Sequence, residues 1–402
     1  MRRFLIVLPC LVALAIAAQA FGRSDGRRPP TETLRGHLFE PAVRGFSPAR
    51  LRQLRVPDGF RVNVFARGLK NARIMVVAPS GAIYLSRRDQ GDVLMLRDRD
   101  GDGRADMRRV VASGIEYAHG LALRGNQLFI AADRKVLRAT TRPDGTLTRP
   151  VVLIDDLPDS GQHPGRGIGF GPDGRLYISI GSTCNACPET NRENATLLRA
   201  RPDGSSREIH AKGLRHTIGF AWEPASRRLW GFDHGSEWRG DSRPPEELNR
   251  LVRGGDYGWP FGFASKRPDR LLVSEPKGMT KAAYYAKTRA PAVTFAAHRA
   301  PIVFLFYTGS QFPTAYQGDA FVTFRGSWNR TRPVGYKVVR VHFENGRPVR
   351  SDDFLAGFLL EGGDAQFGRL AGLAVARDGS LLVAEDQNGI IYRVSSTAAR
   401  AR

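Results

Sequence analysis

The chain repeats one short pattern of apolar and polar positions: an apolar run, a turn rich in Gly, Pro or Asp, and a second apolar run. Two short strands joined by such a turn are typical of a β-hairpin. Five copies follow the pattern closely and a sixth is looser. The close copies are VVAPSGAIYLS from Val76, LALRGNQLFIA from Leu121, IGFGPDGRLYIS from Ile168, FAWEPASRRLWGF from Phe220 and LAVARDGSLLVA from Leu373; the looser one is FLFYTGSQFPTAYQGDAFVTF from Phe304.

The spacing of the copies predicts the fold. The first ones lie about 45 residues apart, which is the period of a four-stranded propeller blade. Almost no helical periodicity lies between them. We therefore predict an all-β chain, a six-bladed β-propeller whose four-stranded antiparallel blades surround a central channel. A β-sandwich would explain the strands but not a repeated turn at this spacing. Residues 265–294 widen the later spacing and are expected to form loops over one face.

The N-terminal region divides into two further segments. Arg2 and Arg3 precede an apolar run that ends in Ala18-Gln19-Ala20, so residues 1–20 are predicted to be a signal peptide. No second apolar run of membrane-spanning length follows, and we expect a periplasmic or secreted protein without an integral membrane segment. Residues 21–50 are polar and are predicted to be a linker or a strap across the propeller. Residues 51–396 form the predicted propeller domain, with VPDGFRV leading into an outer strand.

The charge narrows the choice of ligand. The formal net charge is +22, and arginines are spread along the chain. Such a field favours anionic ligands or an anionic envelope surface. The export signal and the lack of a recognition motif argue against nucleic acid.

Two cysteines remain after residue 20, Cys184 and Cys187 in STCNACP. In an oxidising compartment a C-x-x-C pair most simply forms a local disulfide. Pro188 stands where c-type haem attachment needs histidine, and zinc would need two further ligands that do not lie at finger spacing.

Basic residues come just before each apolar repeat. In a propeller the first strand of each blade lies nearest the axis, so these residues are expected to gather at one mouth of the channel, a common place for binding sites. For any single residue a solvated or hydrogen-bonded role is the simpler interpretation, but their recurrence favours a ligand with several carboxylates. A histidine kept neutral by neighbouring positive charge would suit a general base. The residues are Arg73, His119, His163 with Arg166, Arg215 with His216, His298 and Arg369.

One loop resembles a calcium-binding loop. Asp98, Asp100, Asp102 and Asp106 alternate with other residues, but Arg109 stands where an EF-hand has its bidentate glutamate. An ordinary Asp-Gly hairpin is therefore preferred over a calcium site.

Taken together, five segments make the chain resemble the family of soluble glucose dehydrogenases and sorbosone dehydrogenases, quinoproteins that use pyrroloquinoline quinone (PQQ). The match runs from about Leu54 to Val394. The segments are HPGRGIGFGPDGRLYISIGSTCNAC, GLRHTIGFAWEP, DHGSEWRGDSRPPEELNRLVRGGDYGWP, FRGSWNRTRPVGYKVVRV and GLAVARDGSLLVAEDQNGIIYRV.

The resemblance implies PQQ over the channel mouth, its carboxylates held by basic residues, and calcium at the quinone edge. It implies that His163 takes the proton from the anomeric hydroxyl of a sugar while hydride passes to the quinone, and that calcium and Arg215 polarise the quinone carbonyl. By the same matching, the implied cofactor-binding residues are His216, Arg325 and Arg369, and the implied metal ligands are the carbonyls of Gly235 and Ser236.

The chain also departs from the glucose dehydrogenases. They have an acidic residue that supports the histidine, and this chain has Ser182 there. Partners of this kind fix the orientation and basicity of a histidine. The Cys-Asn-Ala-Cys pair and the PPEELN stretch resemble the sorbosone dehydrogenases instead, so the sugar need not be glucose.

The sequence thus favours an exported, PQQ- and calcium-dependent enzyme that oxidises an aldose or aldehyde sugar and passes electrons to an external acceptor such as a dye, a quinone or a cytochrome. Two alternatives remain: a non-catalytic propeller that binds polysaccharide or protein, and a calcium-dependent lactonase, which would need more acidic ligands at the mouth.

Overall fold

The computed structural model of the protein describes residues 35–265 and 267–397. They belong to one unit of the chain, Leu34–Arg402. The predicted signal peptide, residues 1–20, lies outside the described residues. Among those described, no helix is both long and apolar enough to cross a membrane.

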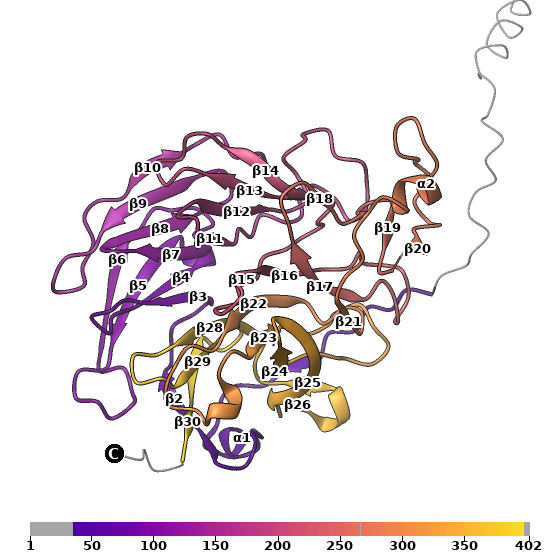
Figure 1. Cartoon of the computed structure of the whole chain (residues 1–402). Helices are drawn as coiled ribbons and strands as arrows, with labels where there is room; N and C mark the ends of the chain where they lie inside the picture. Colours follow the sequence, from indigo (N-terminus) through magenta and orange to yellow (C-terminus); the bar gives the residue numbers. More distant parts are fainter. Residues whose placement is uncertain (1–34, 266, 398–402) are drawn as a thin grey trace, which may run out of the picture. The chain divides into compact units, whose positions relative to one another are not determined.

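Antiparallel sheets of four strands make up most of the described chain (Figure 1). The first sheet contains β3 Ala72–Val77, β4 Ile83–Arg87, β5 Asp92–Arg97 and β6 Met107–Ala112; the second β7 Gly120–Arg124, β8 Gln127–Ala131, β9 Val136–Thr140 and β10 Val151–Ile154; the third β11 Ile168–Phe170, β12 Leu176–Ile180, β13 Thr196–Ala200 and β14 Glu208–Lys212, with the short β18 Gly255–Asp256 parallel to β14; the fourth β15 Phe220–Trp222, β16 Leu229–Asp233, β17 Glu246–Leu251 and β21 Val293–Phe295; the fifth β22 Pro301–Phe306, β23 Ala320–Phe324, β24 Lys337–Glu344 and β25 Arg347–Leu355; and the last β28 Leu370–Val375, β29 Leu381–Glu385, β30 Ile390–Ser396 and β2 Phe60–Ala66. In each sheet most hydrogen-bonded neighbours follow one another in the sequence; the exceptions are β18, which pairs with β14, β21, which pairs with β17, and one strand from the N-terminal end.

Each predicted apolar repeat forms the first hairpin of a sheet. In the hairpin of β11 and β12, Ile168 pairs with Ile178 and Phe170 with Leu176. Gly174 in its turn has φ +71°, a conformation that glycine adopts without a steric cost. The all-β class is therefore confirmed.

The first strands of the sheets surround one cavity of about 410 Å³, which contains residues of β3, β7, β11, β15, β22 and β28 in its lining. Glycines allow these strands to approach one another closely. A Cβ on Gly167 would overlap the carbonyl oxygen of Ile218, and one on Gly372 would overlap that of Arg73. The cavity is therefore the central channel that the repeats predict.

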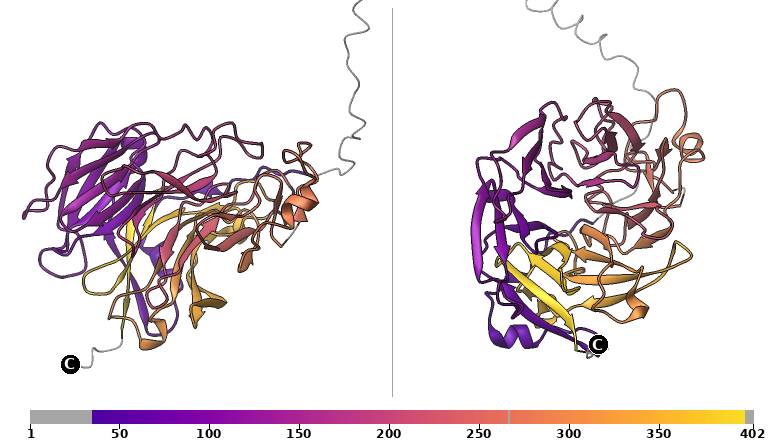
Figure 2. Two further views of the ribbon diagram at one scale, coloured as in Figure 1. Left: turned by 45° about the horizontal axis from the view of Figure 1, so that its top comes forward. Right: turned by 60° about the vertical axis from the view of Figure 1, so that its left-hand side comes forward.

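Strand β2 joins the N-terminal region to the C-terminal sheet. It pairs antiparallel with β30, from Phe60 opposite Ser396 to Ala66 opposite Ile391. In the right-hand view of Figure 2, the sheets follow one another in chain order until the C-terminal strands lie beside the N-terminal ones. The predicted outer strand after VPDGF is thus confirmed.

The remaining elements lie outside these sheets. Within the predicted polar extension, Ala42 and Val43 pair in parallel with Ala365 and Gln366. Ser47 caps the short helix that follows by accepting from the Arg50 N–H, with Pro48 in its first turn. These elements are β1 Ala42–Val43, α1 Pro48–Arg52, β26 Leu359–Leu360 and β27 Ala365–Gln366, and, in or near the predicted insertion, β19 Gly262–Phe263, β20 Arg267–Pro268 and α2 Lys281–Tyr285; single 3₁₀ turns occupy Arg88–Gln90, Thr314–Tyr316 and Glu361–Gly363.

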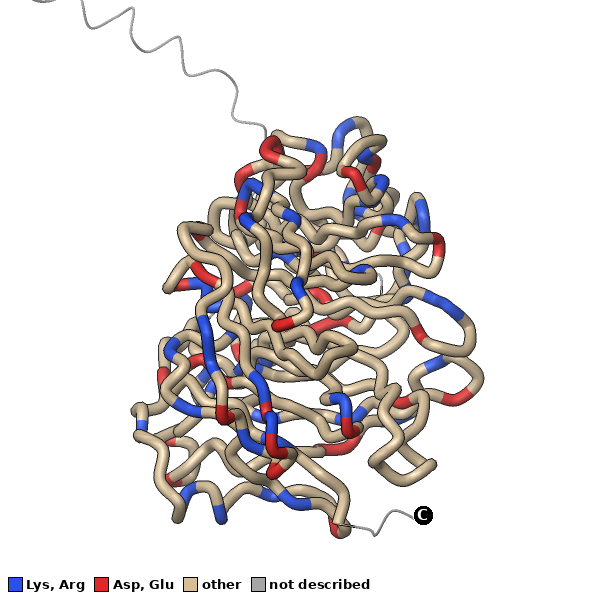
Figure 3. The backbone as a smooth tube through the Cα atoms, turned by 90° about the vertical axis from the view of Figure 1, so that its left-hand side faces the viewer, with Lys and Arg blue, Asp and Glu red and all other residues tan. Residues whose placement is uncertain are grey.

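Basic and acidic positions alternate along the backbone tube, with no segment that holds most of the basic residues (Figure 3). The positive charge is therefore spread over the elements, and a binding site must be identified from local contacts.

Candidate active site

The rings of three histidines lie next to one another: His163 and His216 come before the first strands β11 and β15, and His234 directly follows β16. The ring centroids of His163 and His216 are 4.7 Å apart, and those of His216 and His234 are 5.1 Å apart. Gly181 makes room for His163 and His216, since a Cβ there would lie 2.5 Å from the Cβ of His163 and 2.8 Å from Nδ1 of His216. His163 and His216 were predicted at this place, and the structure brings them together.

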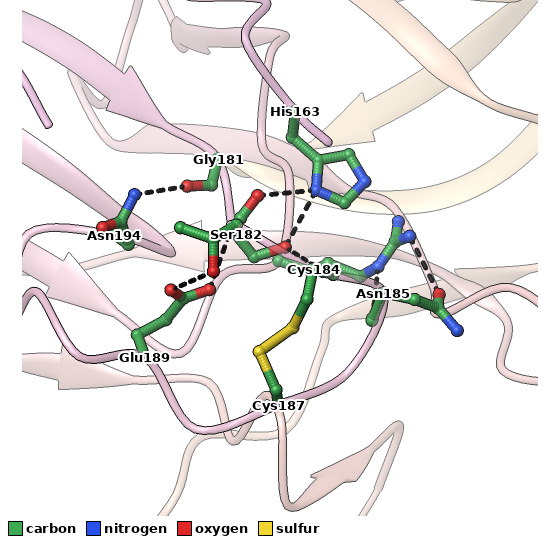
Figure 4. The surroundings of a disulfide bond; sticks show 10 residues. His163, Gly181, Ser182, Cys184, Asn185, Cys187, Glu189 and Asn194 are labelled. Carbon is green, nitrogen blue, oxygen red and sulfur yellow. Dashed lines mark hydrogen bonds between the residues drawn. A yellow bond between two sulfur atoms is a disulfide. The ribbon is translucent and has the colours of Figure 1, made fainter. Parts of the chain in front are cut away.

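The hydrogen bonds of His163 define its tautomer (Figure 4). Nδ1 lies 2.9 Å from both the carbonyl oxygen and the Oγ of Ser182. The Ser182 hydroxyl donates to the Cys184 carbonyl over 2.8 Å, so it can only accept from His163. Nδ1 therefore carries the proton, and Nε2 is left as an acceptor with no hydrogen-bond partner among the described residues. Ser182 thus orients the ring with neutral oxygen atoms.

The surroundings of His163 keep it neutral. Burial, and then the positive charge of Arg215, lower the pKa of His163 to about 3. Burial likewise holds the pKa of His216 well below its usual value, with neighbouring His163 and His234 as further causes. The side-chain nitrogens of His216 also have no hydrogen-bond partner among the described residues, so they are available to a ligand.

The disulfide loop holds Arg215. Cys184 and Cys187 are bonded, as predicted. Asn185, between them, accepts from Arg215 twice: its backbone carbonyl from Nε over 3.0 Å and its Oδ1 from Nη2 over 3.1 Å. The backbone N–H groups of Arg215 and His216 donate to the buried carboxylate of Asp233, which places both side chains at the start of β15.

A second group of basic residues surrounds Asp386. This buried carboxylate pairs with Arg73 and, over 3.0 and 3.2 Å, with Nε and Nη2 of Arg325. Burial opposes its charge, but the two guanidinium groups hold the pKa of Asp386 at about 2. Arg369 contacts the Gly326 carbonyl over 2.9 Å. The buried Nε atoms of Arg73 and Arg369 have no partner. Two guanidinium groups thus share one carboxylate, and Arg73 and Arg369 keep buried donors for an anion.

Arg73 connects this group to the histidines. Its Nη2 lies 3.2 Å from Nε2 of His119, whose Nδ1–H donates to the Arg166 carbonyl over 2.8 Å. Burial, and then Arg73, lower the pKa of His119 to about 3. A neutral His119 therefore accepts from Arg73 and fixes its direction.

Gly235 and Ser236 follow β16 in the same region. Glu246 accepts from the Gly235 N–H over 2.9 Å. Neither the Gly235 nor the Ser236 carbonyl oxygen accepts a hydrogen bond from a described residue. Unpaired carbonyl oxygens beside buried carboxylates fit a hard cation such as calcium.

Two predicted mouth residues are used within the protein. Arg166 is fully buried and donates to Asp133, Pro158 and Ser160. His298 donates from Nδ1 to Glu237 and from Nε2 to the Gly240 carbonyl, both over 2.9 Å. Two acceptors require an imidazolium; although burial opposes it, Glu237 raises the pKa of His298. Neither residue is free to bind a ligand.

The Asp98 loop connects the antiparallel strands β5 and β6, as the hairpin interpretation expects. Carboxylate oxygens of Asp98, Asp100 and Asp102 lie within 4.8 Å of one another, but each of these residues also accepts from a backbone N–H of the loop. Calcium binding here stays the less favoured alternative.

Several site residues were not predicted from the sequence. Asp386, Glu237 and Asn185 gave no signal of their own, because an isolated acidic or amide residue in a loop is common. Asp386 does follow β29 directly, and that position at a strand end on the channel side is the signal that could have identified it.

Comparisons with known proteins show the family and the fold. A family model described as TrAA12-like matches residues 54–397. An uncharacterized protein of Borreliella burgdorferi is 27% identical over 85% of this chain and 90% of its own length. The aldose sugar dehydrogenase YliI of Escherichia coli is 27% identical over 38% of this chain and 43% of its own length.

A solved structure shows the same fold. The PQQ domain of pyranose dehydrogenase from Coprinopsis cinerea, in its holo form, superposes with a TM-score of 0.71 at 18% identity, over 85% of this chain and 97% of that one. The family model, the aldose sugar dehydrogenase relative and this fold together confirm the resemblance to quinoprotein sugar dehydrogenases.

Proposed function

Because the chain belongs to the TrAA12-like family, we propose that it is an exported sugar dehydrogenase that uses PQQ and calcium to oxidise an aldose or an aldehyde sugar. The observation that carries the proposal is His163, a neutral histidine beside Arg215 whose Nε2 has no hydrogen-bond partner among the described residues. In this proposal each four-stranded sheet is one blade of a six-bladed propeller, and the protein is periplasmic or secreted.

His163 is the proposed general base. Its Nδ1–H is held by Ser182, so the proton of the anomeric hydroxyl would pass to Nε2. A pKa of about 3 makes a weak base. An anionic ligand beside the arginines would oppose their charge and raise this pKa toward the working pH. The site is therefore expected to gain its full basicity only when the cofactor is bound.

The basic residues fit a ligand with several carboxylates. Arg73, Arg325 and Arg369 outnumber Asp386 and include buried donors without a partner. We propose that these arginines and His216 hold PQQ, and that the carbonyls of Gly235 and Ser236 hold calcium. When bound, PQQ supplies the hydride acceptor, and Arg215 is proposed to polarise its carbonyl. Electrons would leave to an external acceptor.

The test is a spectroscopic titration of the cofactor-free protein, without residues 1–20, with PQQ in the presence and absence of calcium. Aldoses and a redox dye are then added. We expect calcium-dependent binding and sugar-driven bleaching of the dye. If PQQ does not bind to the folded protein, a non-catalytic propeller that binds polysaccharide or protein is the better interpretation. If the protein hydrolyses a lactone instead, the calcium-dependent lactonase is the better interpretation.

His163→Ala tests the assigned base. It should keep PQQ binding and lose turnover by about 10²- to 10⁴-fold, the usual contribution of a general base. His37→Ala is the matched control. Among the described residues, the His37 side chain hydrogen-bonds only to Asp241 and Thr331, so this variant should retain turnover. Normal turnover of His163→Ala would remove His163 from the mechanism.

A further inference from the structure

The loop from Ser182 to Cys187 contacts both residues proposed to act on the sugar and the cofactor. Ser182 orients His163 (Figure 4). Asn185 orients Arg215. The family resemblance assigns no role to Asn185, and the contacts of Asn185 give it one.

The side chain of Asn185 is held at both of its polar atoms. Oδ1 accepts from the Glu237 N–H over 2.6 Å as well as from Arg215, and Nδ2 donates to the Glu237 carbonyl over 2.9 Å. Exchanging oxygen and nitrogen of the amide would place the NH₂ group against two donors, so these contacts fix the orientation of the amide. Asn185 therefore connects Arg215 to the segment that follows Gly235 and Ser236.

The disulfide restrains Asn185 from both sides. Cys184 and Cys187 enclose Asn185 and Ala186 in a short covalent ring. The ends of the loop are also attached: the Cys184 carbonyl accepts from Ser182, and Glu189 accepts from the N–H and the hydroxyl of Thr183, both over 2.8 Å. Few backbone conformations remain open to Asn185 in such a ring.

Asn185 leaves one end of Arg215 free. It takes Nε and Nη2, and Nη1 has no hydrogen-bond partner among the described residues. A guanidinium group is planar and rigid, so fixing two nitrogens fixes the direction of the third.

We propose that Asn185, restrained by the Cys184–Cys187 disulfide, is a positioning residue that sets the direction of Nη1 of Arg215 toward the bound ligand. The proposal rests on the proposed function for what Arg215 does there, but the restraint on Arg215 exists without it.

Two variants of Asn185 separate positioning from a structural role. Asn185→Ala removes the Oδ1 contacts to Arg215 and Glu237. Asn185→Asp keeps an oxygen acceptor for both; it replaces the donation to the Glu237 carbonyl by a contact between two oxygens and adds a negative charge beside Arg215. In the PQQ- and calcium-loaded protein, Asn185→Ala should lower kcat for sugar oxidation by about 10- to 100-fold, the cost of a small misplacement, with KM for the sugar little changed. Asn185→Asp should restore most of kcat.

The second readout needs no cofactor. Phenylglyoxal modifies accessible arginines, and the rate at Arg215 is followed in the cofactor-free protein by peptide mass spectrometry. Asn185→Ala should accelerate modification of Arg215 several-fold, while Asn185→Asp should resemble the wild type. Modification of Arg199, which is paired with Asp173 and Glu208 away from the loop, should not change.

The double variant Cys184→Ser, Cys187→Ser tests the restraint itself. It should change both readouts in the direction of Asn185→Ala. If it behaves as the wild type in both, the disulfide has no part in positioning. If Asn185→Ala has wild-type kcat and a wild-type rate at Arg215, the proposal is wrong. A wild type that fails to bind PQQ overturns the proposed function alone, because the modification rates are then still compared.

Discussion

At the scale of single residues, burial decides the protonation of the histidines. Burial and neighbouring positive charge lower the pKa of His119 and His163 to about 3 and keep that of His216 far below its usual value. Burial is also the main cause that lowers the pKa of His234, to about 4. His298 differs, because Glu237 outweighs its burial and raises its pKa. One region thus holds neutral histidines beside an imidazolium.

This contrast predicts a pH titration. In cofactor-free protein labelled with ¹³C-histidine, the signal of His298 should titrate above the usual 6.5, while that of His163 should not move between about pH 8 and 5. His298→Gln and His163→Gln assign the two signals by NMR. A midpoint near 6.5 for His163 would contradict the burial argument.

The same histidines affect stability with a defined sign. Below 6.5 the unfolded chain takes up protons at His119, His163, His216 and His234 that the folded chain does not, because their folded pKa values are lowered. Their contribution therefore destabilises the fold as the pH falls from 6.5 toward about 3 to 4, and is absent above 6.5.

The sequence predicted those site residues that lie next to a recognisable local pattern. His163, Arg215 and His216 come just before an apolar repeat, and the repeat locates them at the channel. Asp386 could not be predicted in this way, because its partner Arg73 is 313 positions away and only the folded chain shows the pair. Asn185 was known only as a residue between two cysteines.

At the scale of elements, glycines allow the first strands to approach one another. Gly167 precedes β11, and a Cβ there would overlap the Ile218 carbonyl oxygen, which belongs to the backbone and cannot rotate away. Gly231 on β16 likewise has side chains of Leu251 and Thr217 within 2.9 Å of a Cβ position. Close packing at the channel thus depends on glycines, which have no side chain at these positions.

Gly167→Ala should therefore lower the free energy of unfolding by about 1–3 kcal/mol or more, as overpacking does. Gly45→Ala is the matched control: a Cβ at Gly45 meets nothing within 4 Å, and the change should stay within about 0.5 kcal/mol. Urea unfolding followed by tryptophan fluorescence measures both. Equal midpoints for the two variants would show that the strands can separate without cost.

The sequence predicted the hairpins but not the short pairings around them. Turn residues and apolar runs are local signals, so each first hairpin could be recognised. The pairing of Ala42 and Val43 with Ala365 and Gln366 buries no long apolar run and has no such signal. Residues 21–50 were therefore predicted as a linker or a strap, without the pairing that Ala42 and Val43 make.

At the scale of the whole described unit, the pairing of β2 with β30 joins the N-terminal part of the described chain to the last sheet. The last sheet contains three C-terminal strands and one N-terminal strand, and its core includes Phe354, Leu381, Tyr392 and Val394. Removing β30 takes away the partner of both β29 and β2.

A chain that stops after Gly389 should therefore fail to fold, with loss of the sharp thermal transition followed by circular dichroism. A chain that stops after Thr397 keeps every described residue and should unfold as the full chain does. If the shorter chain retained a cooperative transition at the same temperature, the pairing of β2 with β30 would not be needed for folding.

The pairing of β2 with β30 also orders events in time. The ribosome makes β2 among the first strands and β30 among the last, so β2 must wait through the synthesis of all the strands between them before its partner exists. Contacts between such distant positions form slowly, because a long loop must close first. During that interval the edge of β2 is open to strands of other chains. Pairing with β30 removes this open edge of β2.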